Sequence, residues 1–571
     1  MEMENTNGYS KKTQTALMVM FLLGIFIGAM DDGIVSPART IIADSLNVGA
    51  DSSIWMITIY TLVYAVVMPI SGKLADRYGK KKLFIISITI FGIGSLLSGI
   101  SDLFNSYAFL LTARVIQAIG GGGIMPIATA FIGESFPKEK RGSALGIVGA
   151  TYGIATTLGP TIGSGILNFF GNKSWGLLFL INVPICIIVV LISLKVKIKE
   201  TQYTEKKLDF KGSVVLSLMI LGLMYGVTNL NFANFKDSIT STKVYPYLLL
   251  FLILIPVFIY VEKRAEDAVL NLDFFKNRNI VITLIMALVV GCGMMSVIFI
   301  PQFGENVLRI SQGSGGYLIT IMAVCSGVAA PIGGKLIDKY SAKLVLLIGF
   351  LCTMIGTLLL AFIVCKDNNK VLLFVCLAIM GAGMGLTMGT PLNYLMQVNV
   401  KKTQASSAQA TVSLVKSIGI AVSPNILVNF VAEAGDKMPN ALMKVMPHIQ
   451  GMSGNASMSS GEVPKSILDS FQNADVTSIS NVMKDFASFM FDKAKPAIEH
   501  SLVNHVPPNT TVDAMFNSMK VDYLHQVDGA RVAIENTFQS TLNSGFAGLF
   551  IASAIIAGLG FVVALFLKKQ N

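Results

Sequence analysis

The chain has 571 residues, of which 53% are hydrophobic and only 13% are charged, and its mean hydropathy is +0.66. This composition excludes a water-soluble globular protein of that size and indicates a chain whose solvent is the lipid bilayer. The net charge of +11 does not indicate nucleic-acid binding, because the basic residues follow the membrane topology described below.

Fourteen apolar runs are long enough to cross a bilayer, since a membrane helix needs roughly 20 mostly apolar residues. They predict an all-α polytopic membrane protein. In chain order the predicted spans are residues 15–38, 54–71, 83–99, 109–133, 144–167, 177–194, 212–230, 245–261, 280–300, 317–333, 344–364, 372–396, 408–430 and 544–567.

The basic residues predict the orientation of these spans. With the N-terminus in the cytoplasm, 27 of the 44 lysines and arginines fall on the cytoplasmic side, as the positive-inside rule requires. Lys11 and Lys12 precede an apolar run of spanning length without a small-residue cleavage site, so the first helix is expected to serve as an uncleaved insertion signal. We therefore expect a multi-pass protein of the cell membrane with both termini cytoplasmic.

The first span carries two adjacent acids, Asp31 and Asp32, in its outer half, roughly 22 to 26 Å along a helix. Charges inside a membrane are costly and indicate function. Two neighbouring carboxylates in a low dielectric cannot both be charged cheaply, which is what a proton-coupling site requires. Asp32 has the alternative of facing water at the outer mouth. Arg39, beyond Pro37, is either a substrate contact or an interfacial anchor.

The loop after the second span is basic and contains Asp76, and it recurs after the tenth span around Asp338 at a constant offset of 262 residues. A single such loop is also compatible with a purely topological role. Its repetition favours a role beyond topology, which the family resemblance described below identifies as that of a pair of cytoplasmic gates. The predicted gate residues are Gly72, Asp76, Arg77, Gly79, Lys80, Asp338 and Lys339. The second loop has Ser341 and Ala342 in place of Gly79 and Lys80, which predicts a weaker second lock.

The fourth span contains Arg114 and Gln117. An arginine at membrane depth stays charged and needs a carboxylate or carbonyl partner, for which Asp31 and Asp32 are the candidates. Protonation of the aspartate would then release the arginine. Gln117, Arg39, Met30 and Tyr60 are predicted to contribute to a substrate cavity.

The fifth span reads Gly159, Pro160 and Gly163 within a run of small residues. Small residues allow two helices to approach, and an internal proline removes a backbone hydrogen bond and bends the helix. Ordinary tight packing is the alternative. Residues 153–160 recur at 419–424 in the thirteenth span, so two duplicated six-helix bundles are expected. Lys416 in that span is given a supporting role only.

Residues 431–540 interrupt the pattern and are expected to lie outside the cell, with an amphipathic helix near residues 476–490. The spacing of the four histidines, and that of the six cysteines, predicts no metal site and no disulfide. The expected domains are a first bundle (1–200), a linker with two extra helices (201–265), helices nine to thirteen (266–430), the insertion (431–540), and the last helix with a cytoplasmic tail (541–571).

These motifs resemble those of the fourteen-helix drug:proton antiporter branch of the major facilitator superfamily. The resemblance rests on the gate loop at Gly72–Lys82 and its copy, on Arg114 to Gly123, on Asp31, and on Leu158 to Gly165, where Ser164 replaces a glycine. It implies two six-helix bundles with two helices inserted between them. It also implies a non-enzymatic efflux antiporter of amphipathic or cationic small molecules, driven by a proton gradient without a cofactor.

Two alternatives to drug efflux remain at this stage. The same fold could export a lipid, a peptide or an endogenous metabolite, or the chain could be a membrane sensor or assembly protein that transports nothing. No Gly-x-x-x-x-Gly-Lys-Ser/Thr phosphate loop occurs in the sequence, so ATP is not the expected energy source. The expected partners are a small-molecule substrate, protons and the lipid bilayer, without nucleic acid, and the expected state is a monomer.

Overall fold

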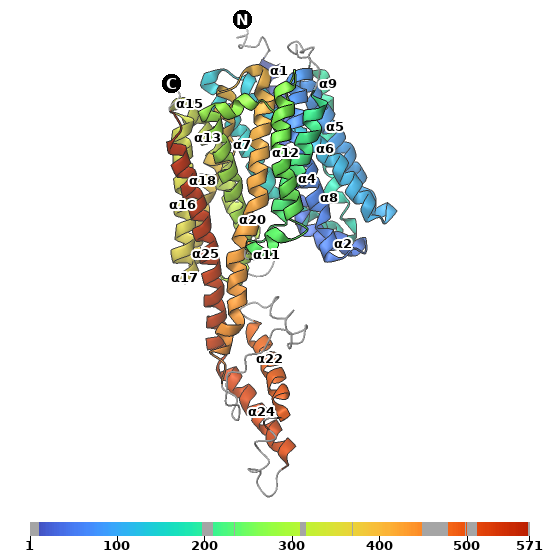
Figure 1. Ribbon diagram of the computed structural model, residues 1–571. Helices are drawn as coiled ribbons and strands as arrows, with labels where there is room; N and C mark the ends of the chain where they lie inside the picture. Colours follow the sequence, from blue (N-terminus) through green and yellow to red (C-terminus); the bar gives the residue numbers. More distant parts are fainter. Residues whose placement is uncertain are drawn as a thin grey trace.

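The computed structural model describes residues 11–196, 209–232, 234–308, 316–367, 369–447, 478–496, 498 and 511–568. Within these residues all regular elements are helices, and 14 of them are long and apolar enough to cross a membrane. The helices stand side by side as one bundle (Figure 1). The start of α1 (Lys11–Ile34) and the end of α25 (Arg531–Leu565) lie at the same end of it, which we call the terminal face. Each of the fourteen predicted spans corresponds to one of these helices.

The first bundle is followed in the chain by two further membrane helices. The first bundle contains α1 (Lys11–Ile34), α4 (Trp55–Tyr78), α5 (Lys80–Gly99), α6 (Tyr107–Ser135), α7 (Lys138–Phe170), α8 (Leu177–Leu180) and α9 (Asn182–Lys195). Two further spans follow, α10 (Phe210–Thr228) and α12 (Tyr245–Arg264), joined through the short α11 (Phe235–Thr240).

The second bundle repeats the packing of the first. It contains α13 (Arg278–Met294), α14 (Ile300–Asn306), α15 (Gly316–Lys339), α16 (Ala342–Leu359), α17 (Cys365–Asp367), α18 (Lys370–Thr387), α19 (Thr390–Val398), α20 (Ala405–Met443) and α25 (Arg531–Leu565). Just as α1 packs on α7 and α5 on α6, α13 packs on α20 and α16 on α18. The duplication therefore extends over whole bundles.

Glycines set the closest helix contacts in both bundles. A Cβ atom on Gly94 of α5 would collide with the backbone of Gln117 in α6, and a Cβ atom on Gly356 of α16 would lie 3.0 Å from the backbone nitrogen of Met380 in α18. Without a side chain the two backbones can approach, which is how membrane helices gain dispersion contacts. Gly94 and Gly356 are 262 residues apart, the same offset as the gate loops.

The first predicted span is longer than the helix it describes. We expected it to reach residue 38, but α1 ends at Ile34 and is followed by a 3-10 turn at Ser36–Ala38 and by the short helix α2 (Arg39–Ser45). Pro37 lies inside this turn and disfavours helical backbone in the residue before it. Arg39 therefore begins a separate helix.

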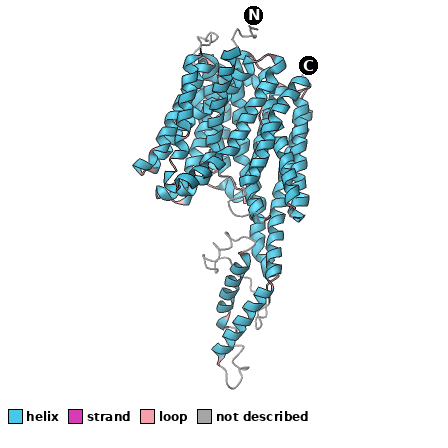
Figure 2. Cartoon of the chain, turned by 180° about the vertical axis from the view of Figure 1, so that it is seen from behind, coloured by secondary structure: helices cyan, strands magenta, loops and turns pink. Residues whose placement is uncertain are grey.

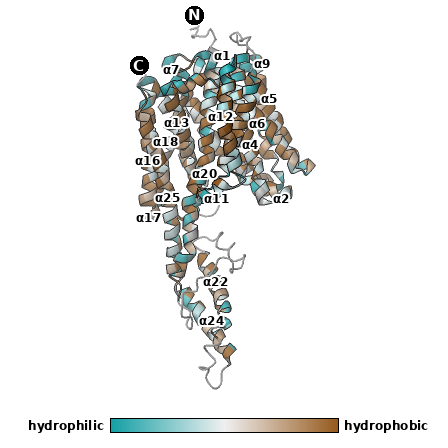
Figure 3. Ribbon diagram, in the orientation of Figure 1, coloured by the Kyte–Doolittle hydropathy of each residue, from teal (hydrophilic) through white to brown (hydrophobic). Residues whose placement is uncertain are grey.

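Helices α20 and α25 are 39 and 35 residues long and project beyond the face opposite the termini, where α22 (Ile479–Lys493) and α24 (Val512–Gly529) lie against them (Figures 1 and 2). The helix expected near residues 476–490 is confirmed by α22. Figure 3 shows more polar colours on this projection than on the sides of the bundle. An apolar core holds the four segments together; it includes Leu442, Met483, Phe491, Phe516, Val527 and Phe538.

The described part of the chain contains one of the four histidines. His448, His500 and His505 lie outside the described residues, and His525 lies in α24. In the described part of the chain no group of three or more His, Cys, Asp or Glu side chains is placed to hold a metal ion.

Candidate functional site

Asp31 is fully buried near the end of α1 and accepts three side-chain hydrogen bonds. Arg114 Nη1 donates to Oδ2 at 2.8 Å, while Gln117 Nε2 and Asn182 Nδ2 each donate to Oδ1 at 2.9 Å. Arg114 also forms a buried ion pair with Asp31, one of the two partners expected for it. Because these donors are attracted by the negative charge of the carboxylate, a proton added to Asp31 removes that charge and weakens the ion pair with Arg114. Protonation and side-chain rearrangement are thereby linked.

Hydrogen bonds and aromatic rings both fix the position of the Arg114 guanidinium. Its Nη1 also donates to Gln117 Oε1 at 2.8 Å, and its Nε donates to the carbonyl oxygen of Met56 at 3.3 Å. The guanidinium carbon lies 3.9 Å from the ring centroid of Tyr60 and 5.5 Å from that of Phe179. Such stacking suits the planar, weakly hydrated guanidinium and lowers the cost of its burial. Tyr60, predicted to line a cavity, lies beneath this guanidinium.

The sequence motifs did not predict two polar residues of this cluster, Ser95 and Asn182. Ser95 Oγ on α5 accepts hydrogen bonds from Gln117 Nε2 at 2.7 Å and from Asn182 Nδ2 at 3.1 Å. Asn182 is the first residue of α9, directly after the break that separates α8 from α9. An amide inside an apolar span is a signal that could have indicated Asn182, whereas a serine is common in membrane helices and indicates nothing by itself.

The small-residue motif of α7 packs against α1 beside Asp31. A Cβ atom on Gly159 would lie 2.7 Å from the carbonyl oxygen of Met30, and one on Gly163 would lie 2.5 Å from that of Ile34. Pro160 touches the position of Gly33. The motif thus provides the close packing predicted for it, and α7 continues as one helix from Lys138 to Phe170.

Three other predicted site residues belong to α1 and α2. Met30 is buried in an apolar group with Ile34 and Ala155, and Arg39 is half-buried at the start of α2. Asp32 belongs to α1, but its side chain lies outside the described part of the structure.

The predicted gate acids each bind the start of a helix in the opposite bundle. Asp76 accepts hydrogen bonds from the backbone nitrogens of Ser406 and Ser407 at 2.9 and 2.8 Å, and from Ser407 Oγ at 2.7 Å. These residues open α20. A carboxylate at this place satisfies free backbone donors and the positive end of the helix dipole. Asp76 thereby ties α4 to the second bundle.

Asp338 forms the mirror-related contact. It accepts hydrogen bonds from the backbone nitrogens of Gly142 and Ser143 at 2.7 and 2.8 Å, and from Ser143 Oγ at 2.5 Å, in the first turns of α7. The receiving segments at Gly142 and Ser406 are also repeats, 264 residues apart. The two bundles are therefore clamped twice at the terminal face.

The basic gate residues distinguish the two clamps. Lys80 Nζ lies 3.8 Å from Asp76 and 3.1 Å from Glu134 on α6, whereas Ala342 stands at the equivalent place in the copy. Asp338 nevertheless accepts as many hydrogen bonds as Asp76. The exchange of Gly79 for Ser341 has a backbone reason: Gly79 has φ +100°, which favours glycine, but Ser341 is extended and caps α16.

The remaining gate residues lie close by. A Cβ atom on Gly72 would lie 2.7 Å from the carbonyl oxygen of Ser406, so this glycine allows α4 to approach α20. Arg77 Nη1 lies 3.6 Å from Asp267, beyond the end of α12. The Nζ of Lys339 lies 5.3 Å from the ring centroid of Tyr340.

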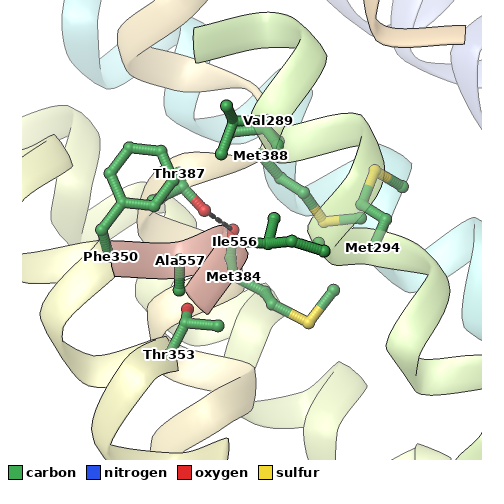
Figure 4. A pocket seen from close by; sticks show the side chains of 11 residues that line it. Val289, Met294, Phe350, Thr353, Met384, Thr387, Met388, Ile556 and Ala557 are labelled. Atoms are coloured by element: carbon green, nitrogen blue, oxygen red, sulfur yellow. Dashed lines mark hydrogen bonds between the residues drawn. The ribbon is translucent and has the colours of Figure 1, made fainter. Parts of the chain in front are cut away.

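The second bundle contains a pocket between α13, α16, α18 and α25 (Figure 4). The pocket is small and partly open, with a cavity volume of about 20 Å³. Its lining is apolar and includes Met294, Phe350, Thr353, Met384, Thr387, Met388 and Ile556. Thr387 is bonded within its own helix, to the carbonyl oxygens of Gly383 and Met384.

One further membrane charge lies between the bundles. Lys416 on α20 is buried, and its Nζ lies 4.5 Å from the ring centroid of Tyr152 on α7. The contact joins the two bundles through a cation and an aromatic face.

Known proteins resemble this chain over most of its length. The family model of the Major Facilitator Superfamily (MFS) matches residues 21–424. An uncharacterised MFS-type transporter of Bacillus subtilis (strain 168), YfiU, is 35% identical over 497 residues, which cover 86% of this chain and 92% of the relative. Multidrug resistance protein 3 of the same strain is 32% identical over 419 residues, covering 73% and 80%.

Two further proteins resemble this chain: a relative whose name states its cargo, and a protein of solved structure. The riboflavin transporter RibZ of Clostridioides difficile (strain 630) is 28% identical over 425 residues, which cover 74% of this chain and 89% of RibZ. Among solved structures, the proton:xylose symporter XylE superposes with a TM-score of 0.51 at 13% identity, covering 73% of this chain and 88% of that one. This last likeness concerns the fold.

Proposed function

The chain belongs to the major facilitator superfamily, a family of transporters rather than enzymes, and on this premise we propose that it is a proton-coupled efflux antiporter. It exports amphipathic or cationic small molecules across the cell membrane by alternating access, as a monomer with cytoplasmic termini. The positive-inside distribution of lysine and arginine supports that orientation. Its relatives include a multidrug resistance protein at 32% identity.

The observation that carries the proposal is the buried contact between Asp31 and Arg114. A proton on Asp31 removes the negative charge that attracts its donors, so the ion pair with Arg114 and the other hydrogen bonds to the carboxylate all weaken. Since those donors come from α6 and α9, proton uptake would loosen α1 from both helices. Proton binding is thereby converted into a change of packing inside the first bundle.

The clamps formed by Asp76 and Asp338 support the alternating-access part of the proposal. Both join the two bundles at the terminal face, and with the proposed orientation this conformation would have its cytoplasmic gate shut. Each clamp consists of hydrogen bonds that rocking of one bundle against the other would break. Reforming and breaking them would alternate the side on which substrate is admitted.

The test uses proteoliposomes with an imposed pH gradient and ethidium as the cationic probe. Wild-type protein is expected to move ethidium only with the gradient, and Asp31→Asn is expected to abolish the gradient-driven component while the protein stays folded. Asp44→Asn, which removes an exposed carboxylate on α2, is the matched control and should retain full transport. Ethidium flux that ignores the gradient in wild-type protein would exclude antiport.

A second candidate cargo is an endogenous metabolite. RibZ, whose name describes a riboflavin transporter, covers 74% of this chain. Riboflavin tested beside ethidium in the same liposomes separates the two cargo classes. Gradient-driven movement of riboflavin alone would replace drugs by a metabolite without changing the coupling mechanism.

A further inference from the structure

Two acidic side chains of the inserted helices converge at the terminal face. Asp209 is the N-cap residue of α10, and Glu262 lies in the last turn of α12. Glu262 is only 3% exposed. Each carboxylate has one oxygen bound by the backbone: Gly212 N donates to Asp209 Oδ1 at 2.7 Å, and Leu270 N donates to Glu262 Oε1 at 2.5 Å.

The other two oxygens share one small space. Asp209 Oδ2 and Glu262 Oε2 are buried and have no hydrogen-bond partner among the described residues. A Cβ atom on Gly212 would collide with Asp209 Oδ2 and would lie 2.7 Å from Glu262 Oε2. Both oxygens therefore face the same glycine, whose missing side chain leaves room for them. A buried carboxylate oxygen without a donor is costly, and two of them side by side also repel.

The neighbouring cations offset the charge of this pair only from a distance: Lys73 on α4 attracts Glu262 but forms its ion pair with Asp267. Among the described residues neither Asp209 nor Glu262 takes part in an ion pair, because Lys73 and Arg77 of α4 both pair with Asp267 in the linker after α12. Both cations of α4 are therefore engaged by a third carboxylate, that of Asp267.

The other charged groups on these elements point elsewhere. Lys211, Lys263 and Glu266 are exposed, and Arg264 stacks on Tyr260. The backbone amide of Val269 also faces Glu262. The surroundings of the pair thus supply backbone donors but no free cation from the described part of α10, α12 and the linker.

We propose that Asp209 and Glu262 form a proton-binding site in which one proton is shared between the two unpaired oxygens. A proton from the cytoplasm bonds to one carboxylate, and the new hydroxyl donates to the free oxygen of the other, so the pair carries one negative charge instead of two. Sharing satisfies both oxygens at once. A metal ion is the poorer occupant, since no group of three suitable side chains is found in the described residues.

The site is connected to a gate. Glu262 holds the amide of Leu270, and Asp267, between them in sequence, binds Lys73 and Arg77 on the helix that carries Asp76. Loss of the shared proton leaves two like charges in one space, which drives α12 and its linker away from α10 and pulls on these ion pairs. The clamp between Asp76 and α20 is expected to weaken as the proton is lost.

The test is an infrared pH titration of the full chain in lipid, without substrate. Wild-type protein is expected to show a carboxylic-acid C=O band that disappears as the pH rises. Glu262→Gln and Asp209→Asn each keep the oxygen that accepts the backbone amide, and each is expected to remove that band. Glu266→Gln is the matched control: it neutralises an exposed carboxylate four residues further along the chain, in the turn after α12, and should leave the band intact.

The result is independent of coupling at Asp31, because the band should persist in Asp31→Asn. A band of equal size in wild-type, Glu262→Gln and Asp209→Asn protein overturns the shared proton, and if one variant does not fold, the other tests the same pair. The link to the gate is measured by amide exchange at Ser406 and Ser407, corrected for the intrinsic effect of pH. Exchange should rise several-fold with pH in wild-type protein and not in Glu262→Gln, and equal behaviour overturns that link.

Discussion

In the first bundle, α1, α5, α6 and α9 enclose Asp31 with its hydrogen-bond donors, whereas in the second bundle the equivalent helices α13, α16, α18 and α25 enclose the pocket of Figure 4. The repeat offsets of 262 and 263 residues place apolar residues or glycine where the first bundle has its polar cluster. Asp31, Arg114 and Gln117 correspond to Gly293, Leu377 and Met380.

The comparison separates packing from chemistry. The glycine contacts that set the distance between α5 and α6 are repeated between α16 and α18, so both bundles keep the same backbone arrangement. At this junction Asp31, Arg114 and Gln117 stand where the second bundle has Gly293, Leu377 and Met380, and they convert an apolar helix junction into one that holds a buried ion pair. A charge pair at this depth is expensive unless each group finds partners, and in the first bundle the partners come from three other helices.

The largest expected effect is the loss of Arg114. Arg114→Met leaves the buried carboxylate of Asp31 without its cation, which should lower the free energy of unfolding by about 3–5 kcal/mol. Leu377→Met, at the equivalent position of the second bundle, is the matched control and should cost less than about 1.5 kcal/mol. Unfolding in mixed detergent micelles measures both.

A double variant decides whether charge is the cause. Asp31→Asn combined with Arg114→Met removes both charges and should recover at least half of the lost stability. If the double variant is as unstable as Arg114→Met alone, the loss comes from packing of the guanidinium on Tyr60 rather than from an unpaired carboxylate.

The second expected effect concerns the glycine contacts. Gly94→Ala places a methyl group against the backbone of Gln117 and should cost about 1–3 kcal/mol through overpacking. Gly356→Ala meets its nearest backbone atom at 3.0 Å and should cost less, because a shift of a few tenths of an ångström relieves it. Thermal unfolding of the two variants compares the bundles, and equal losses would show that the first is packed no more tightly.

The sequence was sufficient for the spans and for the buried charges, since both depend on local composition. All fourteen spans were found, and Arg114 was assigned a partner because so few charges lie in the membrane. The end of α1 was misplaced by four residues because hydropathy continues past Ile34 while the backbone breaks around Pro37. Hydropathy does not register such a break.

The partners of the predicted residues depended on tertiary structure. Asp76 binds Ser406 and Ser407, which are 330 and 331 residues away. Two serines at the start of a helix do not indicate in the sequence that they contact Asp76. Ser95 of the Asp31 cluster was not predicted either, because a serine in a membrane helix indicates nothing by itself. Glu262 was not singled out because it lies at the end of a span among basic residues, where burial cannot be recognised from composition.

The third prediction compares the two clamps. Asp76→Ala and Asp338→Ala each remove three hydrogen bonds at a helix start and should each cost about 1 kcal/mol, as other helix caps do. Lys80 keeps Glu134 as a partner in Asp76→Ala, so the two losses should be similar. Thermal unfolding checks this, and a much smaller loss for Asp338→Ala would support the weaker second lock that the sequence predicted.

The smallest expected effect is a gain in the second bundle. Gly293 lines the pocket, and a Cβ atom added to it meets nothing within 4 Å, so Gly293→Ala should stabilise the protein by about 0.5–1 kcal/mol through helix propensity. Gly28→Ala in α1 is the matched control, because its Cβ would lie 3.8 Å from Ile124, and it should give a similar gain. If Gly293→Ala instead weakens ethidium export at unchanged stability, the pocket takes part in substrate binding, and the apolar bundle then contributes cargo recognition while the polar one contributes proton coupling.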